Sequence, residues 1–270
     1  MARIVVDPVT RVEGHLKLEV EIEGGVVVDA WTGGTLWRGI ELIMQGRDPR
    51  DAEQIMQRIC GVCPTAHATS GILALDDAMG IEPPPNGRII RNLILGSNLI
   101  QSHILHFFHL AALDYVKGPD IAPFKPRYEA DYRLPADVNA QAVDIYLEAL
   151  TIRRKAQEML AIWGGRMPHV QAIVPGGVSE VPDTSKIYKF LNYLQEMQEF
   201  IENKYIPTVK AVADVYSDWL SIGTGCQNLL VYGGYPLEAG LDHVKKKKFW
   251  ESGVYIRGQY KELDISKITE

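Results

Sequence analysis

Two cysteines and a histidine lie within one short segment and could hold a metal ion. Cys60 and Cys63 are separated by two residues, and His67 follows four residues after the second. Thiolates at this spacing can bind one metal together or bridge it to a second metal. Pro64 suits the first position of a helix, whose free N–H groups and positive dipole end would face the sulfurs. This field favours the thiolate, so we predict lowered thiol pKa values and a soft-metal site.

Other interpretations of the cysteine pair stay open on the residues alone. A structural zinc site needs four ligands, usually in two Cys/His pairs, and Cys226 has no partner at that spacing. A redox pair of the thioredoxin type follows a buried strand, whereas residues 51–59 have the pattern of a polar, amphipathic helix. Two buried, unreactive thiols would need no partner at all. The pair is therefore a metal site, a redox pair or two inert thiols.

Two carboxylates could act together with these thiols. Glu13 lies in the segment 7–15, D-P-V-T-R-V-E-G-H, directly before a predicted strand. A solvated turn explains this segment, but burial near a reacting centre would raise the pKa of Glu13 and make it a proton carrier. Glu41 lies just inside a predicted helix. The helix dipole favours a carboxylate there, and the same carboxylate with water ligands suits Mg²⁺.

Three further groups of basic residues invite weaker interpretations. His103, His106 and His109 follow one another at steps of three on a predicted helix, and we expect them to be hydrogen-bonded packing residues. The segment 164–169, G-G-R-M-P-H, predicts either an exposed turn or a contact with a partner. The four lysines at 245–248 predict a solvated loop.

The apolar pattern changes from strand-like to helical near residue 39, which predicts a mostly helical α+β fold. We expect a small N-terminal antiparallel sheet packed on a bundle of long helices. Residues 1–270 should form one continuous region, strand-rich over 1–38, helical over 39–222 and turn-rich over 223–270. The expected strands are 3–6, 16–22, 25–31, 229–232 and 253–257, and the expected helices are 39–46, 50–58, 64–79, 88–116, 137–163 and 184–221, the last split near Pro207.

The composition excludes several classes of protein. A net charge of −6 without a basic aromatic patch argues against nucleic-acid binding. Three cysteines do not make a disulfide framework. Residues 1–7 have no signal-peptide core, and polar residues interrupt the apolar segment 89–116, so neither a signal peptide nor a transmembrane segment is expected. Any export would need a signal carried by a partner.

Taken together, these segments resemble the large, catalytic subunit of nickel–iron hydrogenases, of the uptake or periplasmic type. The resemblance runs from near residue 3 to beyond residue 220, and its motifs are specific in order and spacing. The segments that carry it are R-V-E-G-H at 11–15, R-G-I-E at 38–41, G-R-D-P-R-D at 46–51, Q-R-I-C-G-V-C-P-T-A-H at 57–67, S-H-I-L-H-F-F-H-L at 102–110 and G-G-R-M-P-H at 164–169.

The resemblance implies a role for each candidate residue. Cys60 would be a terminal nickel ligand and Cys63 a bridge between nickel and iron, with cyanide and carbon monoxide on the iron. His67 would donate a hydrogen bond toward the Cys63 sulfur. Glu13 would relay protons from the reversible, heterolytic oxidation of hydrogen, and Glu41 would hold a magnesium ion near this relay.

One departure from the family is large. Its second thiolate pair comes from a C-terminal D-P-C-x-x-C-x-x-H motif, which is absent from residues 1–270. The sequence thus corresponds to the N-terminal half, and a segment carrying that motif is an expected partner. Too few cysteines remain for iron–sulfur clusters, which implies an iron–sulfur small subunit. We expect periplasmic or membrane-associated localisation, and apolar surface exposed where the second half would pack. The alternatives are a relative of the quinone-site subunit of respiratory complex I, which lacks the cysteines, and a non-catalytic interaction remnant.

Overall fold

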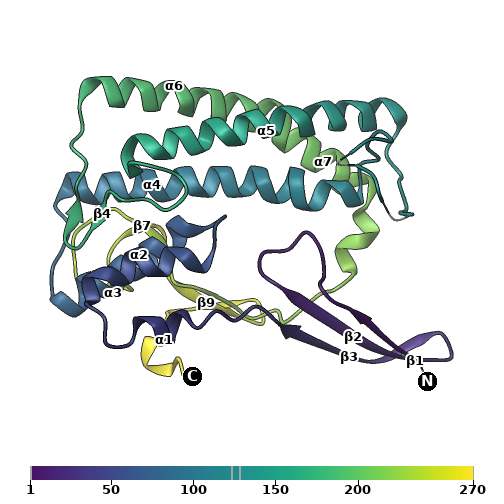
Figure 1. Cartoon of the computed structure of the whole chain (residues 1–270), viewed down its shortest axis with the longest axis horizontal. Helices are drawn as coiled ribbons and strands as arrows, with labels where there is room; N and C mark the ends of the chain where they lie inside the picture. Colours follow the sequence, from purple (N-terminus) through teal and green to yellow (C-terminus); the bar gives the residue numbers. More distant parts are fainter. Residues whose placement is uncertain (1, 123, 128, 270) are drawn as a thin grey trace.

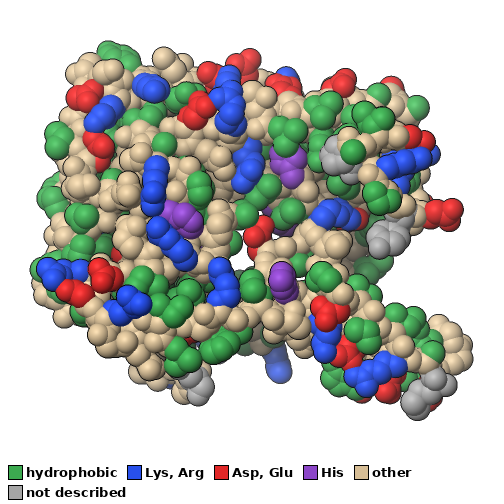
Figure 2. All heavy atoms as spheres, in the orientation of Figure 1, with side chains coloured by type: hydrophobic (Ala, Val, Ile, Leu, Met, Phe, Trp, Pro, Cys, Tyr) green, Lys and Arg blue, Asp and Glu red, His purple; other side chains and the backbone are tan. Residues whose placement is uncertain are grey.

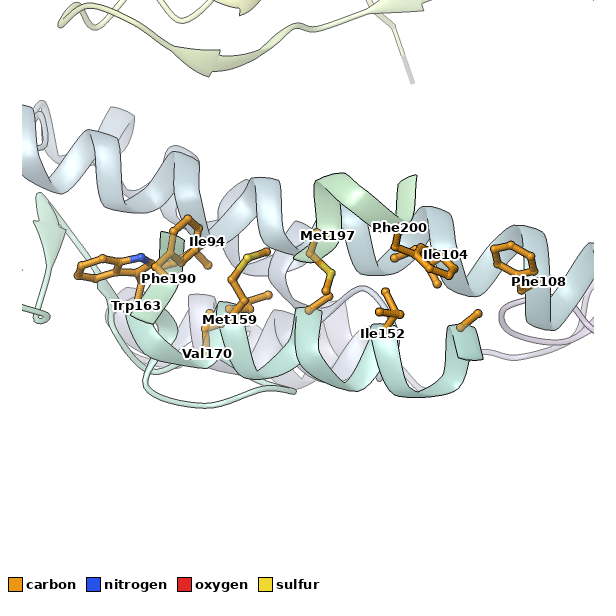
Figure 3. Packing of buried hydrophobic residues seen from close by; sticks show 14 of the residues in the cluster. Ile94, Ile104, Phe108, Ile152, Met159, Trp163, Val170, Phe190, Met197 and Phe200 are labelled. Carbon is orange, nitrogen blue, oxygen red and sulfur yellow. The ribbon is translucent and has the colours of Figure 1, made fainter. Parts of the chain in front are cut away.

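Three long helices form the main layer of the molecule, which we describe from a computed structural model for residues 2–122, 124–127 and 129–269. Helices α4 (Pro85–Ile104), α5 (Ala136–Gly164) and α6 (Thr184–Phe200) lie side by side in this layer (Figure 1). Their apolar faces meet in one core, drawn in Figure 3. The core members without any exposed surface include Ile94, Phe108, Met159, Leu160 and Met197.

The shorter helices pack beside this layer and carry the cysteine segment. The last part of the predicted long helix 88–116 is a π-helix over Leu105–Ala111, followed by a 3₁₀ turn. A second π-helix, Ile201–Tyr205, joins α6 to α7 near the predicted break. The other helices are α1 (Ile40–Met44), α2 (Ala52–Met56), α3 (Pro64–Met79) and α7 (Ile206–Val215), and the 3₁₀ turns are Pro49–Asp51, Gln57–Ile59, Ala112–Asp114, Ser217–Ser221 and Ile265–Lys267.

The N-terminal sheet is antiparallel, as predicted, but it does not pack on the bundle. Strands β1 (Ala2–Val6), β2 (Leu16–Glu23) and β3 (Val26–Gly34) pair in this order. β1 is exposed along its whole length, β3 is exposed at all but one residue, and the sheet forms a lobe beside the main body (Figure 2). The alternation of apolar residues in β2 predicts a covered face, yet no second layer covers it within the described residues. The expected packing of the sheet on the helix bundle was therefore wrong, while the mostly helical α+β class is confirmed.

The C-terminal region forms short antiparallel pairs, within the turn-rich part predicted from the sequence. One sheet has the order β10-β9-β6, and a hairpin-like pair joins β7 to β8. A further pair, β4 with β5, lies earlier in the chain, between α5 and α6, within the part predicted to be helical. Among the described residues, no helix combines the length and apolar character needed to cross a membrane. The strands are β4 (Ile173–Val174), β5 (Gly177–Val178), β6 (Leu229–Val231), β7 (Gly234–Pro236), β8 (Lys248–Trp250), β9 (Gly253–Ile256) and β10 (Gln259–Lys261).

The lysine run 245–248 is not a solvated loop throughout. Lys248 is only 5% exposed, and its ammonium donates to the carbonyls of Tyr232 at 3.0 Å and His243 at 2.6 Å. Lys246 is half-buried. The prediction was wrong for these two residues because β8 begins at Lys248 and brings its side chain under the preceding loop.

The three histidines of the long helix also differ from expectation. His103 and His106 are exposed, and only His109 packs, edge-on against Tyr146 with ring centres 5.0 Å apart. Neither ring nitrogen of His109 has a hydrogen-bond partner among the described residues. Steps of three drift around a helix, and the π-helix 105–111 turns the side chains further, so the three imidazoles do not share one environment.

The segment 164–169 forms a turn that is held by a hydrogen bond between its own residues. The Arg166 guanidinium donates from Nε to the carbonyl of His169 at 2.6 Å. The Arg166 side chain is otherwise exposed, and the chain then enters the core at Val170. The turn predicted from the sequence is present, and its contact with a partner stays a prediction.

A buried ion pair joins α3 to α4 and fixes the β4–β5 hairpin. Asp76 is 1% exposed and pairs with Arg91 at 2.5 Å. The same guanidinium donates to the carbonyls of Gly177 at 2.9 Å and Val174 at 2.7 Å. Asp76 also accepts from the backbone N–H of Gly176 at 2.8 Å. The pair therefore satisfies three backbone polar groups of the hairpin.

Removing one partner of this pair should be strongly destabilising. We expect Arg91→Leu to lower the free energy of unfolding by about 3 kcal/mol, because it leaves the Asp76 carboxylate buried and unpaired. The control is Arg154→Leu, which breaks the exposed pair of Arg154 with Glu158 on α5 and should change stability little. Urea unfolding of both variants measures the difference, and equal effects would contradict the structural role of the buried pair.

Candidate metal centre

A single cavity brings together all five site residues predicted from the sequence. The cavity has a volume of about 680 Å³, and its wall includes Glu13, Glu41, Cys60, Cys63 and His67. They come from the loop before β2, from α1, and from the junction that leads into α3. The rest of the wall is formed by residues 14–15, 36–40, 59 and 61. Residues separated by up to 54 positions in the chain thus share one space that could hold a metal.

The two cysteines lie at a loop-to-helix junction, as the sequence predicts. A 3₁₀ turn ends at Ile59, and Cys60 is extended. Helix α3 begins at Pro64, directly after Cys63. The backbone N–H of Cys63 donates to the Cys60 sulfur at 3.3 Å. Both thiols are free and half-buried, so they are not joined in a disulfide. A helix and a 3₁₀ turn precede the pair, and no strand does, which argues against the thioredoxin-type interpretation.

The electrostatics of the thiols differ from the prediction. Burial, together with the neighbouring Cys60 sulfur and the Glu13 carboxylate, raises the pKa of the Cys63 thiol to about 12. The field of the α3 N-terminus does not outweigh these effects, so the expected lowering of the thiol pKa was wrong for Cys63. A metal that binds here must displace the proton, and metal loading therefore depends on pH.

Glu13 lies beside the first thiol but is not buried among the described residues. The Cys60 thiol donates to Glu13 Oε2 at 3.8 Å. The Glu13 side chain is exposed, contrary to the expected burial, because the loop 7–15 lies at the edge of the cavity. The loop is attached to the long helix by Arg11, which donates to the carbonyl of Leu110 at 2.5 Å. Glu13 is thus held next to a sulfur that could release a proton.

His67 and Glu41 line the cavity, and within the described residues neither side chain is hydrogen-bonded to the sulfurs. Burial lowers the pKa of the His67 imidazole, which favours the neutral ring. No hydrogen bond joins this ring to the Cys63 sulfur among the described residues, so the expected bond is not formed here. Glu41 is exposed in the first turn of α1. Its carboxylate is free of protein partners in the described part of the chain and can take a hard cation with water ligands.

The donor set fits half of a thiolate metal site. Cys60 and Cys63 supply two soft ligands on one cavity wall. Within residues 2–122, 124–127 and 129–269, no group of three or more His, Cys, Asp or Glu side chains could hold a metal by itself. The two thiols are therefore the soft donors that this part of the chain brings together.

Sequence reasoning missed a buried carboxyl that lies behind the cysteine segment. Glu53 is 3% exposed on α2, and its oxygens accept from the amides of Gln57 at 2.5 Å and Gln54 at 2.6 Å. Both amides also donate to the carbonyl of Val170, at 2.9 Å and 3.2 Å. Burial raises the pKa of Glu53 to about 7. A glutamate in a polar helix pattern carries no signal of this burial, which comes from residues more than a hundred positions away.

Glu53 should make stability depend on pH. Its folded-state pKa of about 7 lies above the ordinary value of 4.5, so the native state keeps the proton where the unfolded state has lost it. The contribution of Glu53 to the free energy of unfolding is therefore complete below pH 4.5 and is lost as the pH rises through about 7. From pH 5 to pH 8 we expect the wild type to lose about 2 kcal/mol relative to Glu53→Gln. The control Glu202→Gln, at an exposed site, should show no such difference in urea unfolding, and parallel pH profiles for all three proteins would refute the assignment.

Comparisons with known proteins point to one family. A family model described as nickel-dependent hydrogenase matches residues 38–120 and 116–270, and a model described as HoxL-like matches residues 3–31. The chain is 48% identical to the periplasmic [NiFeSe] hydrogenase large subunit of Desulfomicrobium baculatum, over 99% of this chain and 53% of that protein. It is 34% identical to the hydrogenase-2 large chain of Escherichia coli, over 94% of this chain and 53% of that protein.

A solved structure gives the same result for the fold. The Ni-Fe-Se hydrogenase of Desulfovibrio vulgaris Hildenborough matches with a TM-score of 0.93 and 50% identity, over 98% of this chain and 55% of that chain. The chain spans about half the length of the curated relatives that it matches. The family model covers nearly all of the residues from 38 onward, including both cysteines. The chain therefore belongs to the nickel-dependent hydrogenase family.

Proposed function

We propose that this chain supplies the N-terminal thiolate pair and the proton-relay glutamate of a hydrogenase that oxidises hydrogen reversibly. The observation that carries the proposal is the arrangement of two free thiols and a carboxylate on one cavity wall, with Glu13 Oε2 at 3.8 Å from the Cys60 sulfur. Family membership supports the nickel centre. The cysteines also speak against the alternative of a complex I quinone-site subunit, which lacks them.

The pair is suited to hold nickel and iron side by side. In this proposal Cys60 would hold the nickel and Cys63 would be shared with an iron that would carry cyanide and carbon monoxide. When bound, the nickel–iron centre supplies the heterolytic cleavage of hydrogen into protons and electrons. The relatives from Desulfomicrobium baculatum and Desulfovibrio vulgaris carry selenium in their names, whereas this pair offers sulfur only, so any selenium would enter with the second donor pair.

The residues of the chain then move the proton and tune the site. Glu13 takes a proton from the Cys60 sulfur at Oε2 and passes it outward, which its position at the cavity edge permits. The neutral His67 ring would donate a hydrogen bond toward the Cys63 sulfur when that sulfur holds a metal. Glu41 holds a magnesium ion with water ligands on the same wall.

The proposal requires two partners. A segment carrying D-P-C-x-x-C-x-x-H would supply the second thiolate pair, and an iron–sulfur small subunit would receive the electrons. Apolar side chains around the cavity are available for such contacts, since Trp37 is 71% exposed and Leu42 is 59% exposed. The periplasmic relative supports a periplasmic or membrane-associated location, reached with a partner.

Reconstitution tests this function directly. Expressed alone with the hydrogenase maturation system, residues 1–270 should bind no nickel and should aggregate, because half of the ligands are missing. Co-expressed with a segment carrying the second pair and with the small subunit, the same chain should bind nickel and oxidise hydrogen with a dye as acceptor. A monomeric, active chain 1–270 by itself would show that the half-subunit proposal is wrong. An assembled complex that contains no nickel would instead support the non-catalytic alternative.

A further inference from the structure

A buried amide holds the peptide that lies between the two cysteines. Gln101, on α4, has no exposed surface. Its Nε2 group donates to the carbonyl of Val62 at 3.1 Å and to Asn98 Oδ1 at 3.3 Å. Its Oε1 accepts from Arg153 Nε, on α5, at 3.2 Å. The two long helices thus reach the cysteine loop through one side chain.

The orientation of this amide is set by its partners. A guanidinium can only donate and keeps its charge in proteins, so the Gln101 oxygen must face Arg153. The NH₂ group then points to the other side, where the carbonyl of Val62 and the oxygen of Asn98 accept it. Reversing the amide would place donor against donor and acceptor against acceptor, which costs free energy in a buried site.

The restraint on Val62 extends to the sulfur through the peptide plane. The carbonyl of Val62 and the N–H of Cys63 belong to one peptide bond, which is trans, so they point in opposite directions. That N–H donates to the Cys60 sulfur at 3.3 Å. The loop is open at Gly61, where an added side-chain atom would meet no neighbour within 4 Å. Holding the carbonyl therefore aims the N–H at the sulfur.

We propose that Gln101 and Arg153 are positioning residues that keep the Cys63 N–H donating to the Cys60 sulfur and thereby set the reduction potential of the metal site. A hydrogen bond to a thiolate ligand withdraws electron density from it and stabilises the reduced metal, which raises the potential. The inference rests on the proposed function, because it takes Cys60 as a nickel ligand. It adds two residues that touch neither substrate nor metal.

Two substitutions of Gln101 separate its contacts. Gln101→Glu keeps an acceptor for Arg153 and loses the donor to Val62, whereas Gln101→Met loses both at similar volume. The control is Ser97→Ala, on the same helix and 2% exposed, whose hydroxyl donates only to the carbonyl of Leu93 within α4. Substitution of Arg153 is less informative, because its charge also acts together with that of Glu13.

The assembled enzyme is examined by three measurements. Nickel content comes from elemental analysis, the midpoint potential from a redox titration of the nickel signal in electron paramagnetic resonance, and loop order from hydrogen exchange of peptides that cover residues 60–66. In both Gln101 variants we expect unchanged nickel content, a more negative midpoint potential, and about fivefold faster exchange of the Cys63 amide. Ser97→Ala should match the wild type in all three.

The outcomes distinguish this inference from the proposed function. Nickel-loaded variants with the potential of the control would overturn the inference and leave the function intact. Loss of nickel from both variants would also overturn it, because Gln101 would then serve assembly and not the potential. Absence of nickel from the assembled wild type would overturn the proposed function, and with it the role of Gln101 in setting the reduction potential.

Discussion

Cys60→Ser and Cys63→Ser are each expected to reduce nickel content and hydrogen oxidation to background in the assembled enzyme. Serine keeps the size of the side chain but replaces a soft thiolate by a hydroxyl that does not ionise near neutral pH, and nickel and iron prefer thiolates. Elemental analysis and a hydrogen-uptake assay measure the two effects.

Cys226→Ser provides the matched control for these variants. This third cysteine is exposed and does not belong to the cavity wall, so its replacement should leave nickel content and activity at the wild-type level. Full nickel content in either Cys60→Ser or Cys63→Ser would contradict the assignment of that residue as a ligand.

Glu13→Gln is expected to slow hydrogen oxidation by about two to four orders of magnitude while the nickel content stays unchanged. Glutamine keeps the shape of the side chain and its contact with the Cys60 sulfur, but it cannot take up and release the proton. The loss should therefore fall on proton transfer and leave electron transfer to the partner intact.

The control for the proton relay is Glu23→Gln at the end of β2. This carboxylate is exposed and lies outside the cavity wall, so its loss should not change turnover. Turnover of Glu13→Gln at the wild-type rate would return Glu13 to the role of a solvated turn residue.

Local signals in the sequence were sufficient for much of the fold. Pro64 marks the start of α3, Gly80 its left-handed end, and the glycines at 24–25 the turn between β2 and β3. These features depend on neighbours within a few residues, which a pattern of residue types records. The location of the N-terminal sheet depends on what covers it, and the alternation of β2 only shows that one face is apolar.

The candidate site shows the same division. The five predicted residues share one cavity, and the resemblance of their motifs to those of one family predicts that they belong to one site. The contacts of Gln101 with Val62 and Arg153 join residues that are 39 and 52 positions apart in the sequence, so no local pattern of residue types predicts them. The surroundings of Glu53 and Lys248 also involve distant residues: the amides bonded to Glu53 donate to the carbonyl of Val170, and Lys248 donates to that of Tyr232.

The nickel content of the complex that contains this chain tests the central claim most directly. The chain should be purified from its native assembly, with the accompanying chains identified by mass, and metals counted by elemental analysis. We predict one nickel per copy of this chain, together with a segment that carries the second cysteine pair and an iron–sulfur subunit. A complex that holds both partners but no nickel would contradict the assignment of Cys60 and Cys63 as half of a nickel–iron site.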